Sequence, residues 1–179
     1  MKFNEILNKR KSIRQYDAAK KVDNALIEEM IEAAILAPSW KNGQTSRYYV
    51  VSSEETLNRI KNECLSDWNK KCTKDAPVLI ITSFVKDRVG FEKTGEPSNE
   101  LGNGWGIYDL GLQNSHLLLK ATELGLDTLV MGLRDADKIR EVLEISDKEI
   151  IVSVIAVGYG KEEVERPARK AVSDITKFI

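Results

Sequence analysis

The sequence contains few of the residue types that form metal or disulfide sites. Its 179 residues include only two cysteines, Cys64 and Cys72, and one histidine, His116. These three side chains cannot supply the four ligands of a structural zinc site. We therefore expect both cysteines to be reduced packing residues, with a reactive thiol as the less favoured alternative. His116 has no nucleophile or metal-spaced partner nearby, and we expect it at the surface rather than as a general base.

The chain also lacks an excess of one charge and any long apolar run. It has 27 basic and 28 acidic side chains and a formal net charge of −1, so no overall field attracts nucleic acid or an anionic membrane. The longest apolar runs, such as 149–158, are the length of a strand. The N-terminus has no apolar region typical of a signal peptide. We expect a cytoplasmic protein with neither a nucleic-acid nor a membrane partner.

No repeat, low-complexity tract or linker divides the sequence. Apolar residues make up 42% and charged residues 31%, which is typical of a globular protein. A chain of this length can bury a core without disulfides or a structural metal. We expect one domain over residues 1–179.

Apolar periodicity predicts helices and strands that alternate along the chain. Asp23 is expected to cap the second helix, and Pro38 to end it. Residues 76–85 show no apolar alternation, which predicts a central strand buried on both faces. The expected helices lie around 3–7, 24–37, 57–64, 107–126 and 135–143, and the expected strands are 47–53, 76–85, 127–132 and 149–158. Residues 86–105 are expected as a loop and 161–179 as an extended tail.

The order of these elements lacks the strict strand-helix-strand rhythm of a doubly wound fold. We therefore expect an α+β protein with helices on both faces of the sheet.

Four cations stand close together near the N-terminus. Continued along the chain, the period of the first helix places Arg10 and Arg14 on the side facing the core, while Lys9 and Lys11 point elsewhere. A buried arginine needs an anion or other acceptors, because an unpaired buried charge costs several kcal/mol. Either a bound anion or a protein carboxylate would satisfy Arg10.

A second basic cluster lies near the C-terminus. It contains Arg166, Arg169 and Lys170. If it meets the N-terminal cations in space, one phosphate group is a natural common partner.

Polar side chains also occur together in the loop 37–46. Ser39, Asn42 and Gln44 could donate and accept around the edge of a planar heterocycle, although the loop taken alone is better explained as a turn. Asn114 falls on the apolar stripe of the long helix, and a satisfied core amide is favoured over a contact near a ligand. Gly132, after a strand, would let a ligand approach the backbone.

The glycines of residues 102–106 ("GNGWG") do not have the spacing or setting of a dinucleotide fingerprint. Trp105 in this segment could stack on an aromatic ligand, although a wall or interface position is favoured.

Taken in order, five stretches resemble the nitroreductase family of flavin-dependent oxidoreductases. They are 10–17 ("RKSIRQYD"), 37–51 ("APSWKNGQTSRYYVV"), 67–82 ("DWNKKCTKDAPVLIIT"), 108–133 ("YDLGLQNSHLLLKATELGLDTLVMGL") and 157–172 ("VGYGKEEVERPARKAV"). The resemblance implies a three-layer α-β-α fold with a central mixed or antiparallel sheet. It also implies a homodimer that exchanges its extended C-terminal segments and binds FMN in clefts built by both subunits.

Individual residues of the family motifs can be matched to this sequence. Arg10 and Ser12 would hold the FMN phosphate, and Arg14 would face the N1/O2 side of the flavin ring. The complete set expected at the cofactor is Arg10, Lys11, Ser12, Arg14, Pro38, Ser39, Trp40, Asn42, Gln44, Asn69, Met131, Gly132 and Arg169. Within it, the loop residues and Asn69 would contact the ring edge and ribityl chain. The backbone at Met131 and Gly132 would face N5/O4.

The resemblance implies that NADH or NADPH reduces the flavin, which then reduces nitroaromatics, quinones or similar acceptors by a ping-pong mechanism. A cation at N1 favours the reduced flavin, and no catalytic side chain is assigned. The alternatives are a flavin reductase or NAD(P)H oxidase, and a flavin-binding module without turnover. Phe91 and Trp105 are the large aromatic residues that could shape the acceptor pocket.

Three departures from the family pattern affect these assignments. Trp40 stands where the family usually has a small residue, and residues 45–46 replace a common Pro-Trp pair. Pro167 occupies a position that is often basic, which leaves open whether Arg166 or Arg169 contacts the phosphate.

Overall fold

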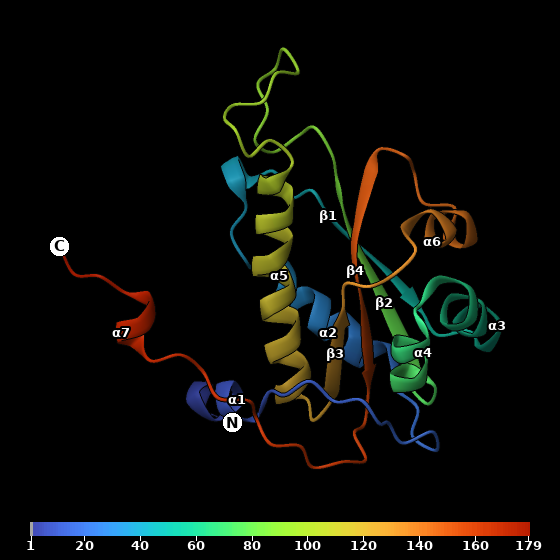
Figure 1. The fold of residues 1–179 in the computed structure, drawn as a ribbon. Helices are drawn as coiled ribbons and strands as arrows, with labels where there is room; N and C mark the ends of the chain where they lie inside the picture. Colours follow the sequence, from blue (N-terminus) through green and yellow to red (C-terminus); the bar gives the residue numbers. More distant parts are fainter. Residues whose placement is uncertain (1) are drawn as a thin grey trace.

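The computed structural model describes residues 2–179, in which helices cover both faces of one four-stranded sheet (Figure 1). The helices are α1 (Phe3–Lys9), α2 (Asn24–Ile35), α3 (Glu54–Arg59), α4 (Asp67–Thr73), α5 (Gly104–Glu123), α6 (Ala136–Leu143) and α7 (Val172–Ile175). The chain also forms two short helical turns, η1 (Trp40–Asn42) and η2 (Ile60–Cys64). The strands are β1 (Ser46–Val51), β2 (Val78–Val85), β3 (Asp127–Met131) and β4 (Glu149–Gly158). The expected α+β fold is confirmed.

The sheet has the strand order β1-β2-β4-β3, and each neighbouring pair of strands is antiparallel. β2 lies between β1 and β4, and seven of its eight residues are buried. This confirms the expectation, drawn from the lack of apolar alternation over 76–85, that it is a central strand. One parallel bridge joins Ser12 to Thr128, so the N-terminal segment lies along the outer edge of β3.

Two apolar clusters fill the spaces on either side of the sheet. On one face, Met30 of α2 and Leu117 of α5 pack with Ile80 of β2. On the other face, Ile60 of η2 and Ile139 of α6 pack with neighbouring core residues. Full burial of each such side chain contributes roughly 1.5–3 kcal/mol, so both helix layers are held to the sheet mainly by apolar contact.

The helix starts follow local capping chemistry. The carboxylate of Asp23 accepts the Ala25 N–H at 3.0 Å, which confirms the cap expected for α2. Asp135 accepts the Lys138 N–H at 3.1 Å at the start of α6, and this hydrogen bond is the main cause of a lowered pKa of Asp135. These side chains satisfy N–H groups that have no partner within the helix.

The helical period of the N-terminus does not continue to residue 14. Helix α1 ends at Lys9, and the backbone then becomes extended. The N–H of Ile13 donates to the carbonyl of Thr128 at 3.1 Å, and Ile13 is buried. The edge of β3 thus offers these residues a hydrogen-bond partner that periodicity cannot reveal. As a consequence Arg14 is exposed and Arg10 is only half-buried, so the prediction that both face the core was wrong.

Helix α5 is shifted from its expected position. It begins at Gly104 and ends at Glu123, after which Gly125 turns the chain with a positive φ of 79°. Leu117 is buried as expected, but Ile107 on the same predicted stripe is 48% exposed. The buried side of the helix includes Asp109, which the apolar pattern did not mark.

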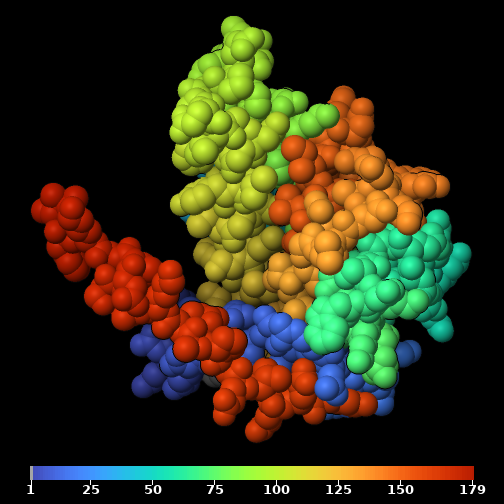
Figure 2. All heavy atoms as spheres, in the orientation of Figure 1, coloured from blue at the N-terminus to red at the C-terminus, as the bar shows by residue number. Residues whose placement is uncertain are grey.

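Apolar periodicity did not predict two short helices, α4 and α7. Helix α4 carries Asn69, and α7 interrupts the otherwise extended tail. Residues 165–179 are exposed, and Figure 2 shows the end of the tail leaving the body of the protein. Within residues 2–179 no helix combines the length and apolar character required to cross a membrane.

Candidate functional site

Three arginines from the two ends of the chain come together beside α1. Arg10 is half-buried, and its pKa is lowered first by burial and then by the positive charges of Arg166 and Arg169. In the described part of the chain, no ion pair joins any of the three to a carboxylate. Arg166 donates to the carbonyl of Leu7 at 3.0 Å, while Arg169 donates to that of Pro167 at 2.7 Å. Both keep further donors, so the cluster can bind an anion such as phosphate.

A hollow of about 370 Å³ lies next to this cluster, between α5, β3 and β4. Arg10, Gly111, Asn114 and Val130 are among its lining residues. The Asn114 side-chain oxygen is buried and has no hydrogen-bond partner in the structure. The favoured interpretation of Asn114 as a satisfied core amide was therefore wrong. An unpaired buried acceptor is costly, and it points to a missing donor at this position.

The residues that follow Arg10 lie along the edge of β3. Ser12 and Lys11 are half-buried in this segment. The backbone N–H of Arg14 donates to a Glu162 carboxylate oxygen at 2.9 Å, and its guanidinium donates to the carbonyl of Ser12 at 3.3 Å. The segment is thus fixed between β3 and the start of the C-terminal tail.

Asn69 connects α4 with the end of β3. Its amide nitrogen donates to the carbonyl of Leu133 at 2.8 Å, two residues beyond the buried Met131. Gly132 between them is exposed, and no atom lies within 4 Å of where its Cβ would be. The backbone at Gly132 is therefore open to close approach by a ligand, beside an amide whose oxygen can accept a further hydrogen bond.

The loop 37–44 has a strained backbone fixed by two hydrogen bonds. Lys41, Asn42 and Gln44 have positive φ angles of 48°, 55° and 49°, a conformation that costs roughly 1–3 kcal/mol for each non-glycine residue. The Trp40 N–H donates to the buried Asp109 carboxylate at 2.9 Å, and the Gln44 N–H donates to the Ser39 hydroxyl at 3.2 Å. Strain of this kind is common at ligand-binding loops. Pro38, Asn42 and Gln44 are exposed at its surface.

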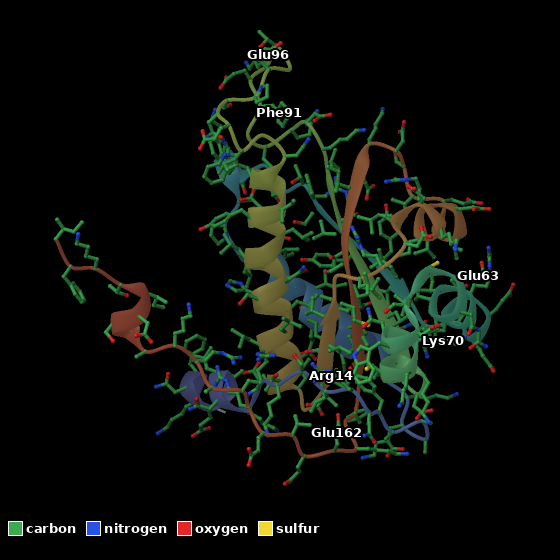
Figure 3. All side chains as sticks on the ribbon, in the orientation of Figure 1. Arg14, Glu63, Lys70, Phe91, Glu96 and Glu162 are labelled. Atoms are coloured by element: carbon green, nitrogen blue, oxygen red, sulfur yellow. The ribbon has the colours of Figure 1, made fainter. Side chains whose placement is uncertain are left out.

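Aromatic side chains pack behind this loop. The ring centroids of Trp40 and Trp105 lie 4.3 Å apart, and those of Trp105 and Tyr108 lie 5.8 Å apart, both in edge-to-face geometry. The indole N–H of Trp105 donates to Asn99 at 2.9 Å. Trp105 is thus part of a wall, as favoured from the sequence. Phe91 is half-buried in the long loop above α5 (Figure 3).

The structure separates the expected site residues into two groups. The first contains the cluster arginines, the edge residues 11–14, Asn69 and the turn after β3. The second is the loop 37–44, which lies at the N-terminal end of α5, whereas α1 lies near its C-terminal end (Figure 1). Most of the length of α5 separates them. One chain therefore does not bring both groups to a single small-molecule site.

The other candidate residues lie outside these groups. Cys64 and Cys72 are free and buried, as expected. Burial is the main cause that raises the pKa of the Cys64 thiol to about 11 and also raises that of Cys72. His116 is exposed, as expected. Sequence reasoning missed Asp109, whose only signal was a carboxylate beside the apolar positions of a long helix.

Known proteins match this chain in sequence over nearly its whole length. A sequence profile described as Nitroreductase family matches residues 7–78 and 66–159. A relative from Methanothermobacter thermautotrophicus, whose name includes NAD(P)H nitroreductase, is 30% identical over 162 residues, which cover 88% of this chain and 77% of that protein. The oxygen-insensitive NADPH nitroreductase of Helicobacter pylori is 24% identical over 205 residues, covering 99% of this chain and 97% of that protein.

Solved structures agree with this result. The crystal structure of a nitroreductase family protein from Streptococcus pneumoniae superimposes with a TM-score of 0.86 and 27% identity, and the match covers 99% of this chain and 100% of that chain.

Proposed function

Because the chain belongs to the nitroreductase family, we propose that it is a cytoplasmic, homodimeric oxidoreductase that binds FMN and takes electrons from NADH or NADPH. Its acceptors would be small electron-poor molecules such as nitroaromatics or quinones. The proposal treats residues 1–179 as one domain. The main observation behind this proposal is that Arg10, Arg166 and Arg169 lie close together without a carboxylate among them.

These arginines fit the phosphate of FMN. A phosphate dianion offers three oxygens to the planar guanidinium groups, and it would offset the repulsion that lowers the pKa of Arg10. The phosphate would be held by Arg10, Ser12 and Arg169. Arg166 would contribute as well, because its positive charge lies close enough to Arg10 to lower the pKa of Arg10. Lys11 would add positive charge at the same end.

The turn after β3 fits the redox end of the cofactor. The open space at Gly132 and the spare oxygen of Asn69 support close contact between the backbone and a planar ring. Arg14 would place a fixed positive charge where reduction adds negative charge, and so would favour the reduced state. When bound, FMN takes electrons from the nicotinamide donor and delivers them to the acceptor, with donor and acceptor using one site in turn.

A second subunit would complete the site. The loop 37–44 lies too far from the arginine cluster of its own chain to share a ligand with it (Figure 1), but it could reach the cleft of a partner. Exposed apolar side chains support such a partner: Ile107 and Tyr108 on α5 are 48% and 59% exposed, and Phe178 in the tail is 90% exposed. We include exchange of the tail between subunits in the proposal.

The purified protein tests this proposal directly. We expect a yellow protein with the absorbance bands of oxidised flavin, which bleach when NADH or NADPH is added without oxygen and return when a quinone follows. A colourless protein that does not take up added FMN would contradict both the cofactor and the reaction.

The same experiment separates the alternatives. If only oxygen or free flavin restores the flavin absorbance after bleaching, the protein is better explained as an NAD(P)H oxidase or a flavin reductase. Bound flavin that neither donor bleaches would favour a binding module.

A further inference from the structure

A second cavity, of about 680 Å³, opens on the outer side of Arg14. It lies between the N-terminal segment, α4 and the start of the tail, and these three pieces of chain run side by side in Figure 2. Its lining includes Arg14, Trp68, Lys71, Lys74, Lys161 and Glu162. In Figure 3, Arg14 lies beside α4, the helix that carries the labelled Lys70, and Glu162 lies below Arg14.

The cavity has more positive than negative charge. Its four cations face two carboxylates, Glu162 and Asp75. Glu162 accepts the Arg14 N–H at 2.9 Å, and Asp75 lies 3.7 Å from the Lys74 ammonium. Lys71 forms no ion pair with any residue in the range 2–179. Lys161 lies 3.9 Å from the Asp17 carboxylate, which does not line the cavity. Lys71 is therefore the cavity lysine without a carboxylate partner, and it remains for an anionic ligand.

An exposed aromatic ring borders these cations. Trp68 is 62% exposed and lines the cavity one helical turn before Lys71 on α4. Residues three apart lie on the same side of a helix, so one face presents an indole ring and an ammonium group together. An indole face can stack on a purine base, and lysines bind phosphate as point charges.

We propose that this cavity binds the adenosine part of NADPH, with its 2′-phosphate at Lys71, Lys74 and Lys161 and its adenine against Trp68. This inference rests on the proposed function, because Arg14 is the residue that this cavity would share with the flavin site. Acidic side chains that bind the ribose hydroxyls select NADH, whereas basic ones accommodate a 2′-phosphate. Since the cavity is lined by four cations and two carboxylates, and Lys71 has no carboxylate partner, this site favours NADPH over NADH as the donor.

The test is equilibrium binding of 2′,5′-ADP to the flavin-loaded protein by calorimetry. We expect Lys71→Met to weaken binding about tenfold, as for loss of one charge-assisted contact. Trp68→Ala should weaken it by a similar factor. Lys71→Arg, which keeps the charge, should restore most of the affinity. The matched control is Lys70→Met, because Lys70 is the neighbouring exposed lysine on α4 but does not line the cavity.

Three outcomes would overturn the inference. The first is no binding of 2′,5′-ADP to the wild type, and the second is equal affinity in the Lys71→Met and Lys70→Met proteins. The third is competition by inorganic pyrophosphate as strong as that of 2′,5′-ADP, which would indicate an anion site without nucleotide recognition.

The assay also separates this inference from the proposed function, because 2′,5′-ADP binding requires no electron transfer. If NADPH bleaches the flavin but substitutions at Lys71 and Trp68 do not change 2′,5′-ADP binding, the proposed function stands. This cavity is then excluded as the donor site. If 2′,5′-ADP binds through these residues but neither NADH nor NADPH bleaches the flavin, the nucleotide site stands. The proposed reaction is then excluded.

Discussion

Arg10 combines partial burial with two neighbouring positive charges, and each of these makes its charged form less favourable. Burial removes water from the guanidinium, and Arg166 and Arg169 repel it. A single chain contains no carboxylate partner for this group in residues 2–179. The residue is therefore suited to an anion that arrives from outside the chain.

Replacing Arg10 with alanine tests its role in binding FMN. We expect Arg10→Ala to weaken FMN binding about 10- to 100-fold, because a hydrogen bond between charged groups contributes roughly 1.5–3 kcal/mol. Fluorescence titration of the protein with FMN measures the change. Lys9→Ala, which removes an exposed cation at the neighbouring position, should change the affinity less than twofold. Equal affinities in the two variants would exclude Arg10 as a phosphate ligand.

Asp109 is a buried carboxylate whose role is to fix the loop 37–44. Burial is the first cause of a raised pKa of Asp109, and the hydrogen bond from the Trp40 N–H acts in the opposite direction. The folded protein therefore holds the proton more tightly than the unfolded chain does. The stability from this effect is fully present below the ordinary pKa of 3.8 and is lost as the pH rises through the raised value.

The substitution Asp109→Asn should remove this pH dependence. The amide oxygen can still accept the Trp40 N–H, and it carries no charge to desolvate, so we expect the melting temperature at pH 7 to be equal or higher. Asp109→Ala leaves the Trp40 N–H unpaired and should cost about 1–3 kcal/mol. Thermal unfolding between pH 4 and 7 measures both effects. If Asp109→Asn steepened the pH dependence, the assigned direction of the shift would be incorrect.

Two of the three glycines in helix α5 have opposite surroundings. A Cβ at Gly106 would lie 2.2 Å from the ring of Phe84 on β2, whereas no atom lies within 4 Å of a Cβ at Gly111. Gly106 therefore allows the helix to approach the sheet. Gly111 instead borders the hollow beside Arg10.

Alanine at these two positions should affect stability in opposite directions. We expect Gly106→Ala to lower the free energy of unfolding by about 1–3 kcal/mol through overpacking against Phe84. Gly111→Ala should raise it by about 0.5–1 kcal/mol, because alanine restricts the unfolded chain and favours helix. Urea denaturation of the two variants provides the comparison. A loss of stability in Gly111→Ala as large as that in Gly106→Ala would contradict this expectation and would place Gly111 in the subunit interface proposed for this side of α5.

The limits of periodicity are clearest in α1 and α5. A local pattern gives the type of an element, and it correctly marked both helices. It could not give the end of α1, because the residues after Lys9 form hydrogen bonds with Thr128, more than a hundred positions away. It also could not show which apolar residues of α5 pack on the sheet and which line the hollow beside Arg10.

For the molecule as a whole, the main feature is an arrangement that one chain leaves incomplete. The loop 37–44 and the arginine cluster beside α1 lie at opposite ends of α5 (Figure 1), and the tail leaves the body (Figure 2). Tail residues Val172, Ile175 and Phe178 are 69%, 71% and 90% exposed. Apolar surface of this extent is stabilised when a partner covers it.

A charge introduced into the tail should weaken the proposed dimer. We expect the wild type to sediment at twice the chain mass of 20.2 kDa. Ile175→Asp should weaken association at least tenfold, because a buried unpaired carboxylate costs several kcal/mol. Thr176→Asp adds the same charge at the neighbouring exposed position and should have a smaller effect. Sedimentation equilibrium measures both, and a monomeric wild type would contradict the two-subunit site.

Apolar periodicity and capping residues act within a few positions of the chain, so they were enough to predict the type and order of the main strands and helices. The lack of alternation between apolar and polar residues over 76–85 also predicted that β2 is buried on both faces, and even its polar residues Thr82 and Ser83 are buried. Local patterns could not show that Arg10 lies near Arg166 and Arg169 or that Arg14 is exposed. They also could not show that Trp68 and Lys71 share a cavity with the tail. These outcomes depend on contacts between distant segments, in which one backbone hydrogen-bond partner or one charged neighbour outweighs the local pattern.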